Sequence, residues 1–374
     1  MLDLFVTVDG QKMRLGYTTG SCAVAAAKAA ALMLTTGTLV NTVSINTPAG
    51  IELNLEVLHA DVQKDGASCA VKKDAGDDSD ATDGIEIYAL VKKRTDGVIK
   101  IDGGTGIGRI NRKGLFGEIG EAAINPVPRK CIAEELKRIS AAGFDVLIYA
   151  PEGEAVGKTT FNKNIGVVGG ISIIGTRGIV YPKSEDAYKK TIELELHAIK
   201  ENDGVESLLL VPGAHGIKTA AELGMKMPAV EMSNFVGFAL QAAYMEGFRR
   251  LYLVGHIGKL AKTSIGIFQT HNRTADTRME AFVYYLALRE APLDLLKKVQ
   301  SALTAEEAAE LVIAAGYEKI FDDMEHGICS RVKTYLKADD VQVKCHIYSM
   351  KRLYLHGISG NDPSACAASF KLIL

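Results

Sequence analysis

Several features that would assign a protein class at once are scarce or missing in this chain. Its 374 residues include only 9 prolines, and 45 acidic residues offset 43 basic ones, which gives a net charge of −2. A general nucleic-acid-binding protein would carry a basic surplus, so this balance argues against that class. Scarce proline beside 37 glycines is untypical of a low-complexity linker. The glycines instead predict many tight turns and close backbone approaches.

Motifs for bound metal and for nucleophilic catalysis are missing as well. The cysteines form no CxxC pair, and no cysteine–histidine cluster has zinc spacing, so no protein-bound metal is expected. We expect small buried thiols in a reducing compartment at Cys22, Cys69, Cys131, Cys329, Cys345 and Cys366. No GxSxG, HExxH or kinase signature occurs, so no motif supports a hydrolase or a kinase.

Long apolar segments are also missing. The first residues, MLDLFVTVDGQK, lack the basic start and the small-residue cleavage site of a signal peptide. The longest uncharged stretch, residues 165–176, is too short to span a membrane and contains several glycines. We therefore expect a cytoplasmic protein that has no membrane partner.

The first half of the chain has the pattern of an antiparallel sheet with two helices. Apolar and polar residues alternate over 51–57 and 85–91, which predicts half-buried strands. Residues 22–34 carry one charge, which predicts a helix buried nearly all round. A second helix is predicted from about residue 128 to 142. The pattern favours a two-layer α+β domain over residues 1–150.

Further along, strands alternate with helices. Short apolar strands are predicted at 207–211, 229–232 and 251–254, each followed by a polar loop and a helical segment. This order predicts a parallel sheet in a Rossmann-like α/β domain over residues 151–374. Ligands of such sheets bind beyond the carboxyl ends of the strands.

The last hundred residues begin with a helical stretch over 275–291. A second helix starts at Thr304, where Glu307 completes a capping box, and ends at Gly316. Strands predicted at 341–349 and 353–358 could extend either sheet.

Two glycine motifs suggest anion contacts. GGTGIG at 103–108 is followed by basic residues, but it is not a complete P-loop, so a ligand contact and a plain glycine turn are both open. GYTTGS at 16–21 leads into the buried helix. Its hydroxyl groups, Thr18 and Thr19 among them, can cap that helix or help to hold a carboxylate or phosphate.

Charged residues gather in two further places. The acidic loop 77–83 lacks EF-hand spacing and is either a solvated turn or part of an active site. Cations follow the third strand of the second domain and suit a substrate with several carboxylates, although a surface ion-pair row would look the same. His256 or His271 could titrate near neutrality, but a lone histidine is more often structural.

Eight motifs occur in a fixed order along the chain: GYTTGSCA at 16–23, DDSDATDG at 77–84, GGTGIGRINRKGL at 103–115, INPVPR at 124–129, KTTFNKNIGVVGGISIIGTRGIVYP at 158–182, SNFVGFAL at 233–240, GHIGKLAK at 255–262 and THNRTADTRME at 270–280. Together they resemble the cobalt-precorrin-5B C(1)-methyltransferase (CbiD) family of anaerobic cobalamin biosynthesis. The resemblance is strong over residues 14–280. The chain departs from the family pattern at Ser79 and Asp83, where proline and histidine are usual.

The resemblance implies that S-adenosylmethionine methylates C-1 of cobalt-precorrin-5B to give cobalt-precorrin-6A. This co-substrate brings its own leaving group, so the protein needs no strong nucleophile or metal, and the cobalt belongs to the substrate. The enzyme must align the ring carbon with the methyl group and exclude water.

On this basis, each candidate residue receives a role. We predict Asp78 and His256 as catalytic residues. The S-adenosylmethionine site is predicted at the sheet edge, at Gly213, His215, Gly216 and Asn234. The residues predicted to bind the corrinoid substrate are Thr18, Thr19, Lys259, Lys262, His271, Arg273 and Arg278.

Two other functions remain open. A nicotinamide-dependent tetrapyrrole reductase would also use a Rossmann-like sheet, but no turn reads GxGxxG with an acidic residue about 20 positions on. A non-catalytic tetrapyrrole carrier would explain the basic residues but not a nucleotide-type sheet edge. The oligomeric state is open, a homo-oligomer included.

Overall fold

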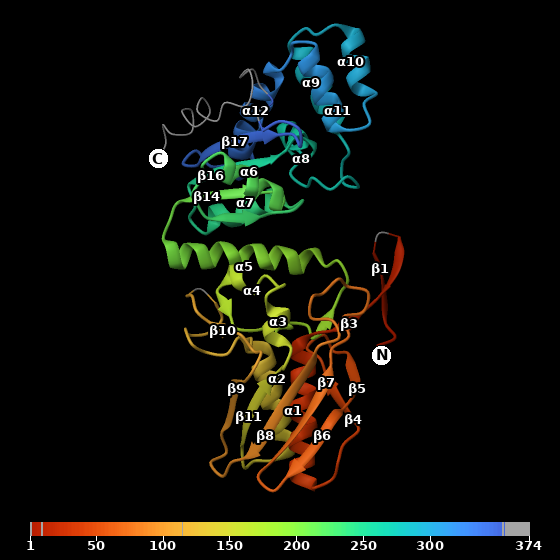
Figure 1. Cartoon of the computed structure of the whole chain (residues 1–374), viewed down its shortest axis with the longest axis vertical. Coiled ribbons are helices and arrows are strands. Elements are labelled where there is room, and N and C mark those ends of the chain that lie inside the picture. Colours follow the sequence, from red (N-terminus) through yellow and green to blue (C-terminus); the bar gives the residue numbers. More distant parts are fainter. Residues whose placement is uncertain (1, 9, 114, 354, 356–374) are drawn as a thin grey trace. The chain divides into compact units, whose positions relative to one another are not determined.

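The computed structural model describes residues 2–8, 10–113, 115–353 and 355. The chain forms two compact units, Met1–Glu185 and Asp186–Leu374 (Figure 1). The sequence predicted the boundary near residue 150. The difference arises because later short strands complete the first unit: β13 (Ile179–Val180) pairs with β3 (Gly16–Tyr17), and β12 (Val167–Val168) pairs with β10 (Arg109–Ile110).

The first unit is built around a mixed five-stranded sheet in the order β6-β7-β8-β11-β9. Only the β11–β9 pair is parallel. The strands are β6 (Leu58–Gln63), β7 (Gly66–Lys72), β8 (Glu86–Lys93), β9 (Ile99–Gly103) and β11 (Phe144–Tyr149). Their inward side chains share one apolar core with α1 (Thr19–Thr36) and α2 (Pro126–Ile139).

Helix α1 confirms the prediction of a buried helix over 22–34. Thr18 caps its first turn, and Gly37 ends it in the left-handed region at a φ of 71°. Among the described residues, α1 is the one helix long and apolar enough to cross a membrane, and 78% of it is buried within the protein. Such burial is typical of a core helix. Helix α2 ends at Ile139, slightly before the predicted residue 142.

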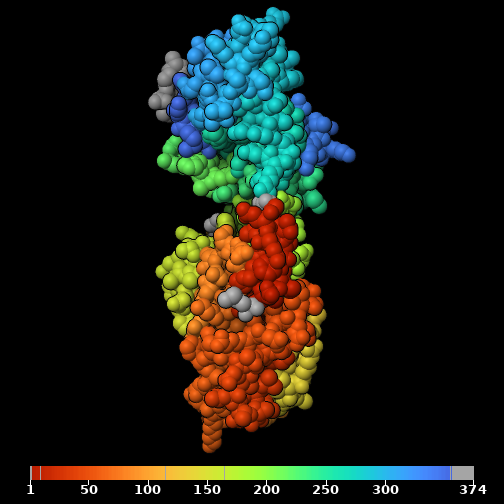
Figure 2. All heavy atoms as spheres, turned by 90° about the vertical axis from the view of Figure 1, so that its right-hand side faces the viewer, coloured from red at the N-terminus to blue at the C-terminus, as the bar shows by residue number. Residues whose placement is uncertain are grey.

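Smaller elements complete the first unit. The predicted strands around Pro48 form the hairpin of β4 (Thr42–Asn46) and β5 (Glu52–Glu56). A second hairpin, β1 (Phe5–Val8) and β2 (Gln11–Arg14), lies on the surface, where it is red in Figure 2. Two short helices, α3 (Gly153–Gly157) and α4 (Asn162–Ile165), follow β11.

The second unit contains a fully parallel sheet in the order β15-β14-β16-β17. The three predicted strands are confirmed as β14 (Ser207–Val211), β15 (Ala229–Glu231) and β16 (Arg250–His256). The strand predicted over 341–349 is β17 (Gln342–Tyr348), and it joins this sheet beside β16. The strand predicted over 353–358 includes positions outside the described residues.

The helices of this unit cover the two faces unequally. Leu208 and Leu210 point into the larger core, while Leu209 and Val211 point toward α6 (Ala214–Glu222). The larger core is shared by α5 (Glu185–Asp203), α7 (Val236–Met245), α8 (Ile257–Ser264), α9 (Arg278–Leu288), α10 (Leu293–Gln300), α11 (Ala305–Ala314) and α12 (Lys319–Leu336). Thr304 caps α11 as predicted, whereas α5, α10 and α12 were not predicted.

The connections reverse direction at the centre of this sheet. The chain leaves β14 for β15 on one side and then returns to β16 on the other side. The loops that follow β14 and β16 therefore separate at the carboxyl edge of the sheet. This edge is where parallel sheets bind ligands.

Candidate functional site

Lys259, near the start of α8, connects two loops at the carboxyl edge of the parallel sheet. Its Nζ donates to the carbonyl oxygen of Pro212, after β14, and to that of Ser233, after β15, both at 3.3 Å. Burial lowers the pKa of Lys259, the carboxylate of Glu231 partly offsets this, and Lys262 lowers the pKa further. A single cation thus holds the ends of two neighbouring strands in place.

Of the two glycines in the turn after β14, Gly216 is required for packing. A side chain at Gly216 would place a Cβ 2.8 Å from the Cβ of Val211 and 2.9 Å from the carbonyl oxygen of Val254. Glycine therefore lets α6 lie directly on the sheet. A Cβ at Gly213 would meet only Glu231 Oε1, at 3.7 Å. His215, predicted at the same site, is exposed.

The turn after β15 is strained and is tied to a later loop. Ser233 has a φ of 50°, a left-handed conformation that non-glycine residues rarely adopt outside constrained sites. The backbone carbonyl of Asn234 accepts from the Thr270 N–H at 3.0 Å, and its side-chain Oδ1 lies 3.4 Å from Thr270 Oγ1. Asn234 therefore anchors the loop that begins at residue 270.

Lys262 anchors the same loop from α8. Its side chain is completely buried, and Nζ donates to the Thr270 carbonyl at 3.0 Å and to Asn272 Oδ1 at 2.6 Å. Burial lowers the pKa of Lys262. The Lys262 ammonium group is thus hydrogen-bonded within the chain, where it holds the 270–273 loop in place.

The other predicted substrate ligands of the second unit lie on or after this loop. His271 and Arg273 are exposed, and the Arg273 N–H donates to His271 Nδ1 at 3.2 Å. Arg278 makes a two-pronged contact with Asp276, at 2.7 and 3.0 Å, which lowers the pKa of Asp276. An incoming carboxylate would have to compete with Asp276 for Arg278.

Both ring nitrogens of His256 are used within the chain. Nδ1 accepts from the Gly258 N–H at 3.0 Å, which caps α8, and Nε2 lies 2.6 Å from Glu306 Oε1. Because Nδ1 accepts, Nε2 carries the proton and donates to Glu306. This arrangement favours a positioning role for His256, since neither nitrogen is left to exchange a proton with substrate.

In the first unit, the start of α1 is enclosed by a later segment of the chain. Thr18 Oγ1 accepts from the Ser21 N–H at 3.2 Å. Thr19 Oγ1 donates to the Ser172 carbonyl at 3.1 Å and accepts from the Ile174 N–H at 3.0 Å. The Gly20 N–H is also paired, with the Ile174 carbonyl. These contacts leave α1 little capacity to bind an anion.

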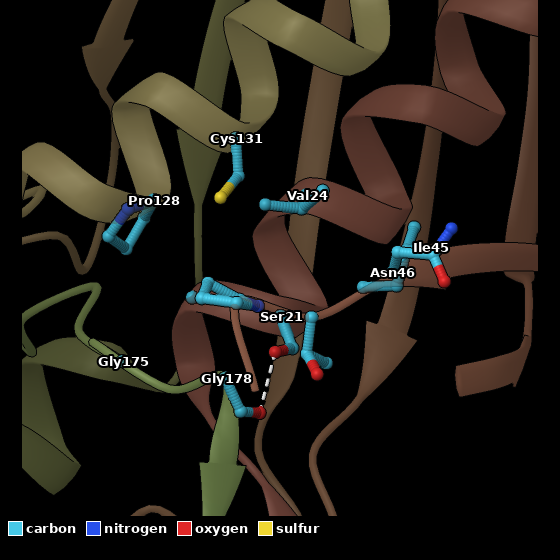
Figure 3. Close-up of a pocket in the computed structure, with 11 residues that line it drawn as sticks. Ser21, Val24, Ile45, Asn46, Pro128, Cys131, Gly175 and Gly178 are labelled. Atoms are coloured by element: carbon cyan, nitrogen blue, oxygen red, sulfur yellow. Dashed lines mark hydrogen bonds between the residues drawn. The ribbon is translucent and has the colours of Figure 1, made fainter. Parts of the chain in front are cut away.

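A pocket beside this helix start is small. Figure 3 shows that the Ser21 hydroxyl points to the Gly178 carbonyl, 2.7 Å away, while Val24, Pro128 and Cys131 line the same space. The pocket has room for about one water molecule. It cannot hold a macrocycle in this conformation.

The acidic loop is folded by its own carboxylates. Asp78 Oδ1 accepts from the Lys183 N–H at 2.8 Å, and Asp83 Oδ1 accepts from the Ala75 N–H at 2.8 Å. Buried Lys73 pairs with Asp80 at 2.6 Å. Burial tends to raise the pKa of Asp80, but Lys73 and Thr82 outweigh it and the pKa is lowered. The predicted catalytic residue Asp78 thus lies in a turn that is held by hydrogen bonds, while its neighbours Asp77 and Ser79 are exposed.

The glycine motif at 103–108 serves backbone packing. A Cβ at Gly106 would lie 1.8 Å from the Ala150 carbonyl oxygen. A Cβ at Gly153 or Gly170 would lie 2.2 Å from the Gly106 carbonyl oxygen. Of the two alternatives for this motif, these contacts favour the glycine turn.

Glu231 is the residue at this edge that the sequence analysis missed. It ends β15, and its carboxylate faces Gly213 and lies near Lys259. The signal in the sequence was an acidic residue 18 positions after Gly213. It was overlooked because the turn reads GAHG rather than GxGxxG. Among the described residues, no group of three or more His, Cys, Asp or Glu side chains could hold a metal ion.

Comparisons with known proteins match most of the chain. The family model described as CbiD matches residues 6–182, and the model for the CbiD C-terminal domain matches residues 269–356. The chain is 54% identical to a protein named cobalt-precorrin-5B C(1)-methyltransferase from Alkaliphilus oremlandii, over 94% of this chain and 99% of the relative. It is 56% identical to a protein of the same name from Treponema denticola, over 94% and 98%. A crystal structure of cobalamin biosynthesis protein (cbiD) from Archaeoglobus fulgidus is 26% identical, with a TM-score of 0.41, and the alignment covers 74% of this chain and 88% of that chain.

Proposed function

Because this chain belongs to the CbiD family, we propose that it is a methyltransferase that acts on C-1 of cobalt-precorrin-5B in cobalamin biosynthesis, giving cobalt-precorrin-6A. The observation that carries this proposal is the identity of 54–56% to methyltransferases of that name over nearly the full length of both chains. A cytoplasmic location stays a prediction from the sequence, and the oligomeric state stays open.

S-adenosylmethionine is the proposed donor, and the second unit is its proposed site. We regard the parallel sheet as Rossmann-like, with the cofactor at the loops that hold Gly213, His215, Gly216 and Asn234. The fit rests on Gly213, where the backbone is open apart from Glu231, and on the strained turn at Ser233. The bound donor supplies an activated methyl group together with its leaving group.

The protein's own task is then to bind and to align. Lys259 and Lys262 fix the loops after β14 and β15 and the loop that starts at residue 270. His271 and Arg273, on that last loop, are proposed to bind substrate carboxylates, and Arg278 can join them if Asp276 is displaced. Thr18, Thr19 and Asp78 stay candidates in the first unit, although their polar atoms already have partners in the chain.

Calorimetric titration with S-adenosylhomocysteine and with NADPH separates this proposal from its two alternatives. Binding of S-adenosylhomocysteine alone supports the transferase. Binding of NADPH alone supports a tetrapyrrole reductase, and binding of neither supports a carrier.

The loop residues can be tested separately. Replacing both His271 and Arg273 by Ala should raise the KM for the corrinoid by about tenfold or more, because charge-assisted hydrogen bonds are lost. The affinity for S-adenosylhomocysteine should not change. An unchanged KM would remove these two residues from the substrate site.

A further inference from the structure

Glu231 and Gly213 face each other across the ends of two neighbouring strands. Glu231 is the last residue of β15, and Gly213 lies two positions after the end of β14. Val211 is in register with Glu231 in the parallel pair. Because Oε1 of Glu231 lies 3.7 Å from the position of a Gly213 Cβ, the missing side chain leaves room beside the carboxylate.

The carboxylate of Glu231 is available to a ligand. Residues that the structure describes donate no hydrogen bond to it, and the side chain is only half buried. Its backbone is fixed, since the carbonyl oxygen lies 3.4 Å from the Tyr188 hydroxyl and the strand pairs with β14. An ionised carboxylate with open lone pairs is a strong acceptor for hydroxyl groups.

Lys259 holds the backbone on either side of Glu231 in place without neutralising the charge of the Glu231 carboxylate. Its Nζ donates to the backbone carbonyls on either side of the Glu231–Gly213 pair, those of Pro212 and Ser233. The cation is close enough to Glu231 for their charges to interact. The hydrogen bonds of Lys259 meanwhile fix the two loops.

A carboxylate at the end of the second strand, next to a glycine turn after the first, is the arrangement that binds adjacent ribose hydroxyls in parallel sheets. We propose that Glu231 binds the 2′- and 3′-hydroxyl groups of the ribose of S-adenosylmethionine, with the backbone at Gly213 close beneath the nucleoside. This inference rests on the proposed function, because it assigns the sugar subsite of the donor.

The test combines a changed residue with a changed ligand. Binding of S-adenosylhomocysteine and of its 2′-deoxyribose analogue is measured by calorimetry for the wild-type chain, Glu231→Ala and Glu231→Gln. The wild type should bind the deoxy analogue about tenfold or more weakly, because one hydrogen bond to a charged group is lost. Both variants should bind S-adenosylhomocysteine about tenfold or more weakly and should discriminate between the two ligands by less than about twofold.

A matched control comes from the same unit. Glu222→Gln removes an exposed carboxylate at the end of α6 and should keep wild-type affinity and discrimination. Thermal unfolding of each variant identifies losses caused by misfolding, and Glu231→Gln retains the side-chain volume.

Wild-type discrimination in both Glu231 variants would overturn the assignment, as would a wild type that does not distinguish the two ligands. Either result would leave methyl transfer by the wild type intact. Failure of the proposed function would instead appear as a wild-type chain that transfers no methyl group to the corrinoid.

Discussion

The Nε2 atom of His256 lies 2.6 Å from Oε1 of Glu306, where β16 passes into α8. The same ring caps α8 through its other nitrogen. Since Lys259 belongs to the first turn of that helix, the cap and the Glu306 contact together place the cation that joins the loops after β14 and β15.

This relationship predicts different results for two substitutions of His256. Asn can still accept the Gly258 N–H, so His256→Asn should keep most of the stability and activity. His256→Ala loses the cap and should lower the free energy of unfolding by about 1–2 kcal/mol. Urea unfolding and the pH profile of kcat check the prediction. Loss of activity in both variants, together with a missing limb of the pH profile, would instead make His256 an acid or base of the reaction.

Lys262 should matter for stability more than its charge alone suggests. Lys262→Met leaves the Thr270 carbonyl and Asn272 without their buried donor, so we expect the free energy of unfolding to fall by about 2–3 kcal/mol. Lys226→Met, at an exposed position, should change it by less than about 0.5 kcal/mol. The measurement is guanidinium unfolding of both variants, and equal effects would refute the anchoring role.

The glycine at position 106 should be irreplaceable for steric reasons. Its φ of 73° is nearly that of Gly50, 76°, but only Gly106 would drive a Cβ into a carbonyl oxygen, that of Ala150, while nothing lies within 4 Å of a Cβ at Gly50. Gly50→Ala should therefore lower the free energy of unfolding by about 1 kcal/mol, because only the left-handed conformation is unfavourable there. Gly106→Ala should lower the free energy of unfolding by more than about 3 kcal/mol. Thermal unfolding compares the two, and similar losses would contradict the packing argument.

Glu325, on α12, predicts a pH dependence of stability. Burial raises its pKa to about 8, although the Ile347 N–H donates to its carboxyl group at 2.7 Å. Between about pH 4.5 and 8 the folded chain keeps a proton that the unfolded chain releases, so this group lowers the free energy of unfolding as pH rises. Above pH 8 Glu325 is ionised in both the folded and the unfolded chain, and the loss of stability is complete.

Gln cannot ionise, so Glu325→Gln should be more stable than the wild type by about 2 kcal/mol at pH 8.5, with the difference shrinking toward pH 5. Urea unfolding at both pH values measures this difference. Glu222→Gln, at an exposed site, should show no such trend. A gain that is the same at both pH values would rule out the ionisation of Glu325 as its cause.

Local sequence patterns predicted the elements whose signal lies within their own residues. The strand at 207–211 and the cap at Thr304 follow from an apolar run and from a capping box, and both are confirmed. Helix α12 was missed because charged residues separate the members of its apolar face, Ile320, Met324, Ile328 and Val332. Such a face becomes clear only when the core against which it packs is known.

Contacts between distant residues were beyond the sequence. Lys262 reads as an exposed cation until the fold places it beneath Thr270. For the motif that contains Gly106, the sequence left a ligand contact and a glycine turn both open, and the position of Ala150 beside Gly106 favours the turn. Glu231 stands 18 positions after Gly213 in the sequence, but it becomes clear that the two lie beside each other only once β14 and β15 are paired.

The most direct test of the function is transfer of an isotopically labelled methyl group. The purified chain is incubated with cobalt-precorrin-5B and S-adenosylmethionine carrying a ¹³C-methyl group, and the corrinoid product is analysed by mass spectrometry and NMR. The proposed function predicts one labelled methyl group per corrinoid, bonded to C-1, and an equal amount of S-adenosylhomocysteine. A corrinoid that gains no label, or gains it at another carbon, would contradict it.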